Sequence, residues 1–415
     1  MASSSVAASE YFRCCRDIEQ LDIDRANGDT LDGTLEPNSD GIIQVALLKT
    51  TLNGATSNTV TFIGSLGIAL SCLGIFVIPL AAVIGARWIS IIGILVYRIS
   101  NIASSWAVSS VGGMFVASGL LHGVGVCFIY AISNSLPVQW FDSRLGTANG
   151  FIKLGGGIGA TVMSIVAGVL TDRLGVAWTF RIFRLLAFVI GVSPAILIRE
   201  RVLRRQKRFT IDWNLFTDVP FCRLFAAGVV GVLSVYAPPF FLPAVATSLG
   251  FSPSVVGGVV ASFNAAMTIG RVLGGFACDK LGSMNVFVLT MALNAVTMFA
   301  VWSFASTLPI LIVFSIFNGI SNGTFFTSYG TAVGRLADEW RGAGAIIFAI
   351  TGWFPGLLVG NPIAALLIDS TGARDANSIV PYRPTIFYTA STALLSLAFG
   401  LVARLWVSTC LIKKL

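Results

Sequence analysis

Charged side chains are scarce in this sequence. Only 11% of its 415 residues are Asp, Glu, Lys or Arg, whereas an ordinary soluble domain carries about 25%. Hydrophobic residues make up 55% of the chain, and a soluble protein of this length could not bury them without exposing large apolar patches. The composition excludes a soluble enzyme, a disordered chain and a disulfide-stapled secreted domain, and it indicates that lipid is the solvent.

Residue types that carry chemistry are also few. The sequence has one histidine and seven cysteines. It shows no His, Cys and acid cluster with metal-ligand spacing, no phosphate-binding loop and no serine-nucleophile elbow. Four of the cysteines lie in apolar runs, which indicates reduced, buried thiols rather than a disulfide framework. The sequence predicts no metal, no cofactor and no enzymatic activity.

Acidic residues are concentrated at the N-terminus. Residues 1–58 hold nine of the 19 acids but only four of the 27 bases. This segment is polar, rich in Ser, Asp and Gly, and without helical periodicity. We expect a solvated, disordered tail, which ends in a remnant of a first helix.

Long apolar runs fill the rest of the chain. A bilayer core needs about 20 mostly apolar residues per helix. Five runs of this length form a predicted N-terminal bundle over 59–198, and six form a C-terminal bundle over 213–415, with a basic loop at 199–212 between them. The predicted fold is an all-α polytopic membrane protein with about 11 spans. The runs lie at about 60–84, 89–108, 111–132, 148–170, 180–198, 221–243, 254–277, 286–305, 308–329, 343–368 and 385–408.

The loops between these runs differ in charge. One set of alternate loops, together with the C-terminus, holds 13 Lys and Arg residues, and the opposite set holds three. The positive-inside rule then places the central basic loop and the C-terminus in the cytoplasm. We expect a multi-pass protein of the plasma membrane, and this charge distribution explains the basic pI of about 9.3 without a nucleic-acid partner.

A loop signature follows the second run of the C-terminal half. The residues Gly275-Phe-Ala-Cys-Asp279-Lys280-Leu-Gly282 resemble the G-x-x-x-D-R/K-x-G loop of the major facilitator superfamily, whose members join two six-helix bundles by a basic loop. An Asp at a helix end can accept hydrogen bonds from the N-terminus of a neighbouring helix and stabilise one conformation. We expect this role for Asp279.

The corresponding loop of the N-terminal half is incomplete. It keeps Gly85 and Arg87, but Ala82 stands at the position of the Asp. The first helix is incomplete as well, because its apolar run ends at Leu48. We therefore expect a major facilitator fold with two helical bundles in which the first of 12 spans is missing or truncated.

Further stretches resemble the fungal monocarboxylate porter-like branch of this superfamily. Members of that branch import or export small organic acids, riboflavin or secondary metabolites. The resemblance implies a secondary transporter that moves a small organic anion or a fungal metabolite by alternating access. The alternative is a degenerate, non-transporting carrier or a membrane sensor without helix 1. The stretches lie within roughly 59–410 and include Phe62–Leu66, Arg144–Gly150, Tyr236–Pro243, Asn264–Arg271 and Val359–Ala364.

Ionisable groups inside spans mark candidate site residues, because placing one at the bilayer centre costs about 2.5–3.5 kcal/mol on insertion scales. Arg271 lies about two turns before Asp279, and its guanidinium can bind a carboxylate in a fork. Alternatively, it pairs with a polar group such as Asn264, which is itself a candidate for an amide contact with the substrate. Arg271 resembles the anion-binding arginine that some carriers hold in helix 8. Some of those carriers also have an acid one turn before this arginine, where this chain has Met267. Proton coupling therefore stays open.

Three further ionisable residues lie within spans. Lys153 could add a second positive charge to the site or extend to the cytoplasmic face. Arg98 lies in mid-span without an obvious acid partner. His122, the only histidine, could carry protons or be a packed core residue. A cavity lined by such cations would favour a small anionic substrate.

Overall fold

The computed structural model of the chain describes residues 57–107, 109–141, 144–155, 213–337, 342–370 and 378–408, together with the single residues 158, 178 and 182. The acidic tail, the truncated first helix and the basic loop at 199–212 lie outside this described part. Most of the runs at 148–170 and 180–198 lie outside it too. Within the described residues, every regular element is helical.

The described part of the N-terminal half begins with a broken helix. Its elements are α3 (Ser57–Ser71), the 3-10 turn η1 (Gly74–Phe76), α4 (Val77–Ile84), α5 (Ala86–Ala107), α6 (Val111–Met114), the π-helical turn η2 (Phe115–Leu121) and α7 (His122–Trp140). A further helical stretch, segment 145–155, follows α7.

The C-terminal half consists of longer helices. Its elements are η3 (Trp213–Thr217), α10 (Val219–Ser248), α11 (Pro253–Leu281), α12 (Ser283–Val296), the π-helical turn η4 (Thr297–Val301), η5 (Trp302–Phe304), α13 (Leu308–Leu336), α14 (Gly342–Thr351), α15 (Trp353–Ser370), η6 (Val380–Tyr382) and α16 (Arg383–Val407).

Membrane-spanning helices account for nearly all of the described chain. Eight helices of the described part are long and apolar enough to cross a bilayer, and the bent pair Phe62–Ser71 and Gly74–Ala81 makes a ninth span. These nine coincide with nine of the predicted runs. The other two runs lie mostly outside the described residues. The prediction of an all-α polytopic membrane protein is confirmed.

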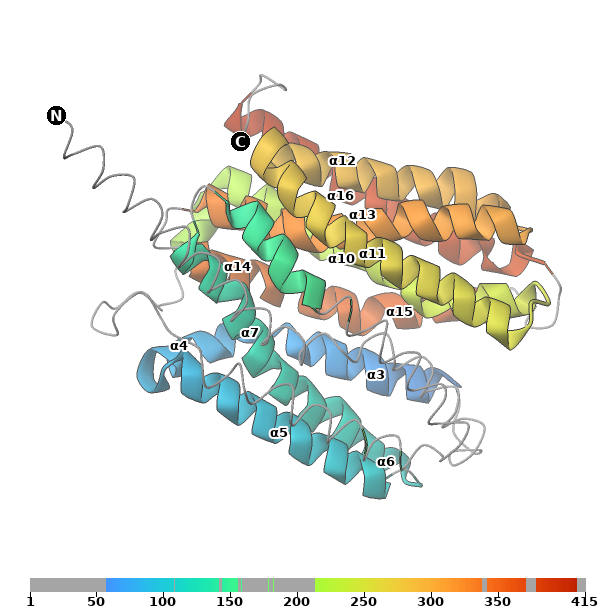
Figure 1. Cartoon of the computed structure of the whole chain (residues 1–415), viewed down its shortest axis with the longest axis horizontal. Helices are drawn as coiled ribbons and strands as arrows, with labels where there is room; N and C mark the ends of the chain where they lie inside the picture. The colour runs from blue at the N-terminus through green and yellow to red at the C-terminus, as the bar shows by residue number, and fades with distance from the viewer. Residues whose placement is uncertain are drawn as a thin grey trace, which may run out of the picture.

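The helices form two groups. Figure 1 shows α3 to α7 on one side of the molecule and α10 to α16 on the other. Helix α15 lies beside α3, where the two groups meet. Within the C-terminal group, α11 and α13 cross closely at glycines, because a Cβ at Gly270 would lie 2.2 Å from the Ile320 carbonyl oxygen. Small residues allow this approach where no hydrophobic force drives helices together in lipid.

Two broken helices face each other across the halves. The first span bends by 40° between Ser71 and Gly74, which leaves the Ile75 N–H without a helical partner. This group donates to the Thr351 hydroxyl at 3.2 Å, at the end of α14 and next to the break at Gly352. A Cβ at Gly74 would lie 2.8 Å from Cγ2 of Ile347, so the two halves are in close contact here.

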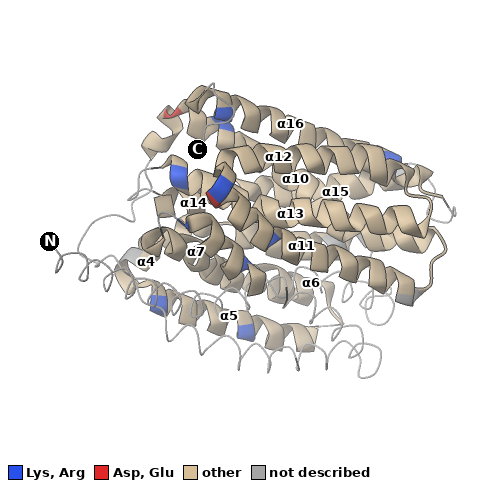
Figure 2. Ribbon diagram, turned by 45° about the horizontal axis from the view of Figure 1, so that its top comes forward, with Lys and Arg blue, Asp and Glu red and all other residues tan. Residues whose placement is uncertain are grey.

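Charges are unevenly distributed over the molecule. Figure 2 shows most of the blue segments toward the end at which the C-terminus is marked, and few at the opposite end. This distribution agrees with the loop asymmetry in the sequence. The assignment of that end to the cytoplasm stays a prediction.

Candidate functional site

Segment 145–155 begins against the C-terminal end of α11, where Asp279 lies. The carboxylate of Asp279 accepts hydrogen bonds from the backbone N–H groups of Gly146 at 3.0 Å and Thr147 at 2.7 Å, and from the Thr147 hydroxyl at 2.7 Å. The first N–H groups of a helix have no intrahelical partner and favour negative charge. Asp279 therefore links the end of a C-terminal helix to the start of an N-terminal one.

Arg335, near the end of α13, binds the same carboxylate. Its Nη2 lies 2.6 Å from Oδ1 of Asp279, and its Nη1 donates to the Cys278 carbonyl at 3.3 Å. The side chains of Arg335 and Asp279 are 22% and 14% exposed. This ion pair thus lies at the border between solvent and the buried helix contact.

The other residues of the loop signature shape the turn. Gly282 has φ 92° and Gly85 has φ 96°, a region that side chains other than glycine rarely adopt, so both loops use the same glycine turn. Lys280 and Arg87 are exposed. The role of these residues in stabilising a conformation stays a prediction.

Glycines bring the two halves into backbone contact beside Asp279. A Cβ at Gly275 would lie 2.5 Å from the Gly146 carbonyl oxygen, and a Cβ at Gly150 would lie 2.7 Å from the Arg271 carbonyl oxygen. About one turn after Gly146, Nδ2 of Asn149 donates to the Thr331 hydroxyl at 3.1 Å. We call this contact of segment 145–155 with α11 and α13 the seam, and its Asp279 end the closed end.

Lys153 and Arg271 meet at the inner end of the seam. The Lys153 ammonium donates to the Phe326 carbonyl at 2.5 Å, and Nη1 of Arg271 donates to the Lys153 carbonyl at 2.7 Å. Both side chains are buried, with 8% exposure each. Within the described part of the chain neither cation pairs with a carboxylate, and Nε of Arg271 has no hydrogen-bond partner there.

Aromatic side chains surround these cations. The guanidinium of Arg271 lies 5.9 Å from the ring centroid of Phe326, and Tyr236 meets that ring edge-on at 5.8 Å. Tyr130 and Tyr236 lie within electrostatic range of Arg271. Tyr130, Tyr236 and Phe326 are each partly exposed although they belong to inner helix faces.

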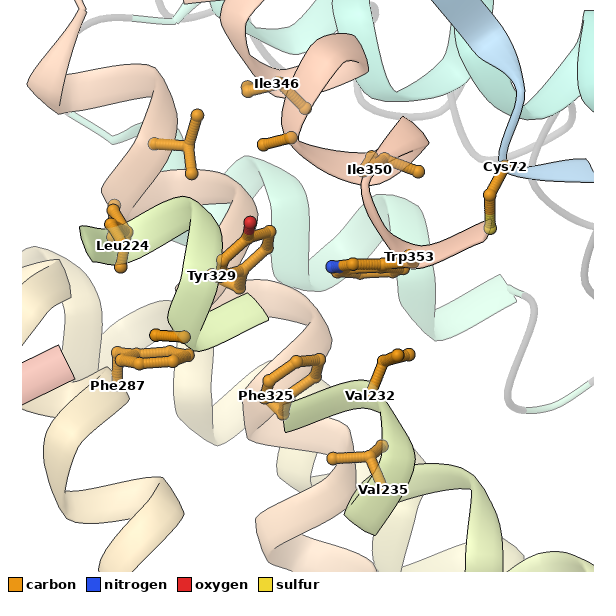
Figure 3. Packing of buried hydrophobic residues seen from close by; sticks show 14 of the residues in the cluster. Cys72, Leu224, Val232, Val235, Phe287, Phe325, Tyr329, Ile346, Ile350 and Trp353 are labelled. Carbon is orange, nitrogen blue, oxygen red and sulfur yellow. The ribbon is translucent and has the colours of Figure 1, made fainter. Parts of the chain in front are cut away.

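An apolar cluster adjoins the site on the side of α13 and α15. Figure 3 shows Phe325, Tyr329 and Trp353 packed together, with Cys72 of the N-terminal half at the edge of the cluster. The rings of Phe325 and Tyr329 are stacked with centroids 5.8 Å apart. This cluster fixes the position of α13, which carries the Phe326 carbonyl that Lys153 binds.

The remaining sequence candidates lie elsewhere in the described chain. Asn264 is 1% exposed on α11, and its Nδ2 has no described partner. Arg98 is buried on α5 at 7% exposure. His122 packs its ring against Tyr97 with centroids 5.4 Å apart. The structure therefore brings Lys153 and Arg271 together, whereas Arg98 lies on α5 and His122 at the start of α7.

Sequence reasoning missed Tyr130 and Tyr236. The criterion was the cost of an ionisable group in lipid, and a neutral phenol does not meet it. Tyr236 did lie in a stretch with family resemblance, but Tyr130 had no such signal. Their place beside Arg271 follows only from the way in which α7 and α10 are packed in the folded chain.

Comparison with known proteins identifies the family. The model of the Major Facilitator Superfamily matches residues 38–244 and 224–409. The chain belongs to the major facilitator superfamily. The expected fold of two helical bundles is thereby confirmed, and the chain is a multi-pass membrane transporter of a small molecule rather than an enzyme. No finding tests its assignment to the monocarboxylate porter-like branch.

Curated relatives of this superfamily member are fungal. The MFS-type transporter pynF of Aspergillus niger is 28% identical over 339 residues, which are 80% of this chain and 77% of that protein. The Fujikurins efflux protein of Gibberella fujikuroi is 25% identical over 71% of this chain and 64% of that protein. The Aspyridones efflux protein apdF of Emericella nidulans is 26% identical over 62% of this chain and 53% of that protein.

Solved structures share the fold at low identity. The human organic anion transporter MFSD10 (TETRAN) superposes with a TM-score of 0.70 at 11% identity, over 91% of this chain and 97% of that one. A bacterial homologue of the iron transporter ferroportin, in an outward-facing state, gives 0.67 at 14% identity over 92% and 99%. These likenesses concern the fold alone.

Proposed function

We propose that this superfamily member exports an acidic secondary metabolite by alternating access between its two bundles. The names of two relatives, efflux proteins for fujikurins and for aspyridones, support export and the metabolite class. The choice of an acidic cargo depends on the site. Arg271 and Lys153 place two basic side chains at the interface of the bundles.

The proposal is carried by the lack of a carboxylate partner for these cations among the residues that the structure describes. Arg271 and Lys153 are both about nine-tenths buried, and burying an uncompensated charge is expensive. Backbone carbonyls of Lys153 and Phe326 solvate them only in part. An anionic ligand would compensate the charge, and a planar one would also stack on Phe326 and Tyr236.

The loop charges support a plasma-membrane topology with the closed end of the seam in the cytoplasm. In that orientation the described conformation is closed toward the cytoplasm. Cargo would then enter only after the seam has opened. The chain would then divide into a tail (1–58), an N-terminal bundle (59–198), a cytoplasmic loop (199–212) and a C-terminal bundle (213–415).

A flux assay tests this function. The purified chain is reconstituted in liposomes, and counterflow of fujikurins, aspyridones, benzoate and lactate is compared with that of protein-free liposomes. We expect flux of at least one acidic compound and none of its methyl ester. Repeating the assay with a proton gradient of either sign tests coupling to protons.

The same assay decides between transporter and sensor. A chain that folds and binds an acidic compound without moving it would support the alternative of a sensor or degenerate carrier. Neither flux nor binding for any acidic compound would overturn the proposal. Flux of lactate alone would favour the monocarboxylate porter-like branch over metabolite export.

A further inference from the structure

The ammonium of Lys153 holds the two bundles together in the described conformation. It belongs to the N-terminal half and donates to the Phe326 carbonyl on α13 of the C-terminal half. A Cβ at Gly330 would lie 3.5 Å from Nζ, so the ammonium lies directly against the backbone of α13. This hydrogen bond is the innermost link of the seam.

The link uses only part of the donors at this position. An ammonium has three N–H donors and a guanidinium five, and Lys153 has one described partner for its ammonium. Nε of Arg271 has no partner among the described residues. Arg271 is attached to the carbonyl of Lys153 itself, so the two cations are held next to each other with donors to spare.

A carboxylate would compete well for these donors. Hydrogen bonds from a cation to an anion are shorter and about twice as strong as neutral ones, whereas the Phe326 carbonyl is an uncharged acceptor. A carboxylate bound by Arg271 would therefore attract the neighbouring ammonium away from α13. The seam would lose its inner link, so that the Asp279 contacts at the closed end alone would oppose its opening.

We propose that Lys153 is a substrate-sensitive tie between the bundles: it binds the Phe326 carbonyl in the described conformation and exchanges this bond for the anionic group of the substrate. The part that concerns the substrate rests on the proposed function. The tie itself does not, because it is a contact of the described conformation. Occupancy of the site thereby loosens the seam from its inner end.

Cys278 offers a native reporter of seam opening. It is 0% exposed next to Asp279, and a Cβ at Gly146 would lie 2.8 Å from its Cβ, so a maleimide reaches the thiol only when the bundles separate. The experiment uses the full chain with the other six cysteines replaced by alanine. The rate of labelling by N-ethylmaleimide is then normalised to that of the denatured protein.

Lys153→Met keeps the length of the side chain and removes its donors. We expect it to raise the labelling rate about tenfold without any ligand, as for loss of one hydrogen bond from a charged group. Arg223→Met is the matched control, because it removes a cation of α10 that lies over the ring of Trp406, away from the seam. A folded Lys153→Met protein that labels as slowly as wild type would overturn the tie, and this result holds whether or not the chain transports anions.

A second arm tests the substrate response with benzoate as probe. Benzoate should accelerate labelling of the wild type and leave the rate of Lys153→Met unchanged, since its tie is already lost. Equal acceleration of both proteins, or of neither, would overturn the exchange. If Lys153→Met fails to fold, Lys153→Gln replaces it. Glutamine keeps a neutral donor, so we expect a labelling rate above that of wild type but below that of a protein in which the tie is fully broken. A labelling rate equal to that of wild type would overturn the proposal.

Discussion

Asp279→Asn is the most direct test of the seam. The carboxylate accepts four hydrogen bonds, from Gly146, from the backbone and hydroxyl of Thr147, and from Arg335. Asparagine has nearly the same shape, but it carries no charge. Its NH₂ group would also replace one acceptor oxygen by a donor, which would face another N–H or O–H donor. The substitution therefore lowers the stability of the closed conformation. It has little effect on an open conformation, in which these hydrogen bonds are absent.

The magnitude follows from the kinds of bond involved. A hydrogen bond to a charged group contributes about 1.5–3 kcal/mol against about 0.5–1.5 kcal/mol for a neutral one, and negative charge at a helix N-terminus adds about 0.3–1 kcal/mol. Partial exposure limits the share of the Arg335 ion pair to about 1 kcal/mol. We expect a loss of about 2–4 kcal/mol in total, which lowers the closed-to-open ratio about 30- to 1,000-fold.

The assay needs a reporter away from the mutated site. Ile347 is 3% exposed and lies on α14 against Gly74 of the other half, so Ile347→Cys in a cysteine-free chain is labelled only when the halves part. Its labelling rate measures the open fraction while that fraction is small. Asp218→Asn is the matched control, because Asp218 is an exposed acid just before α10.

The expected order of effects makes the reasoning falsifiable. Asp279→Asn should raise the rate by about 30-fold or more, and Arg335→Met should raise it by about fivefold, for about 1 kcal/mol. Thr147→Val, which loses only the hydroxyl donor, should have a similarly small effect. A folded Asp279→Asn protein that labels within about threefold of the Asp218→Asn control would refute the claim that this carboxylate holds the seam.

Three further predictions concern other parts of the structure. Arg271→Lys should lower transport about tenfold or more, since a fork is replaced by a point charge, while membrane levels stay near wild type; equal loss of both would show a structural role. Gly275→Ala should open the seam and speed reporter labelling, because its Cβ would lie 2.5 Å from a carbonyl oxygen, whereas Gly257→Ala on the same helix, with no atom within 4 Å, should not. Thr351→Val should lower the thermal midpoint in detergent by an amount that corresponds to about 1–3 kcal/mol, because the Ile75 N–H loses its acceptor, and Thr351→Ser should retain the wild-type value.

The spans could be predicted because the bilayer imposes a simple rule on the sequence. A helix must offer about 20 apolar residues to cross it, and nine runs that meet this rule are spans in the described structure. The acceptor role expected for Asp279 likewise follows from local chemistry at a helix end. Its partners Gly146 and Thr147 lie more than 130 residues away in the sequence, and no local pattern links them to it.

The site was predictable only where burial of charge signals it. Arg271 and Lys153 stood out as cations in apolar runs, but their contact with each other depends on how segment 145–155 crosses α11. The same signal also selected Arg98 and His122, which lie outside the described site. Tyr130 and Tyr236 give no such signal, because a phenol can be buried in any helix bundle that supplies one partner.

The contacts on the two sides of the interface differ in kind, and this difference bears on how the halves move. The seam contains Asp279, Arg335, Lys153 and Arg271, whose hydrogen bonds are directional and charged. The facing contact at the broken helices has apolar side chains and a neutral hydrogen bond to Thr351. Apolar surfaces can shift against each other at little energetic expense, whereas buried charges need a replacement partner before they separate. We therefore expect the contact at the broken helices to part readily once the seam has opened, and the seam to open only when an anion or water takes over its charges.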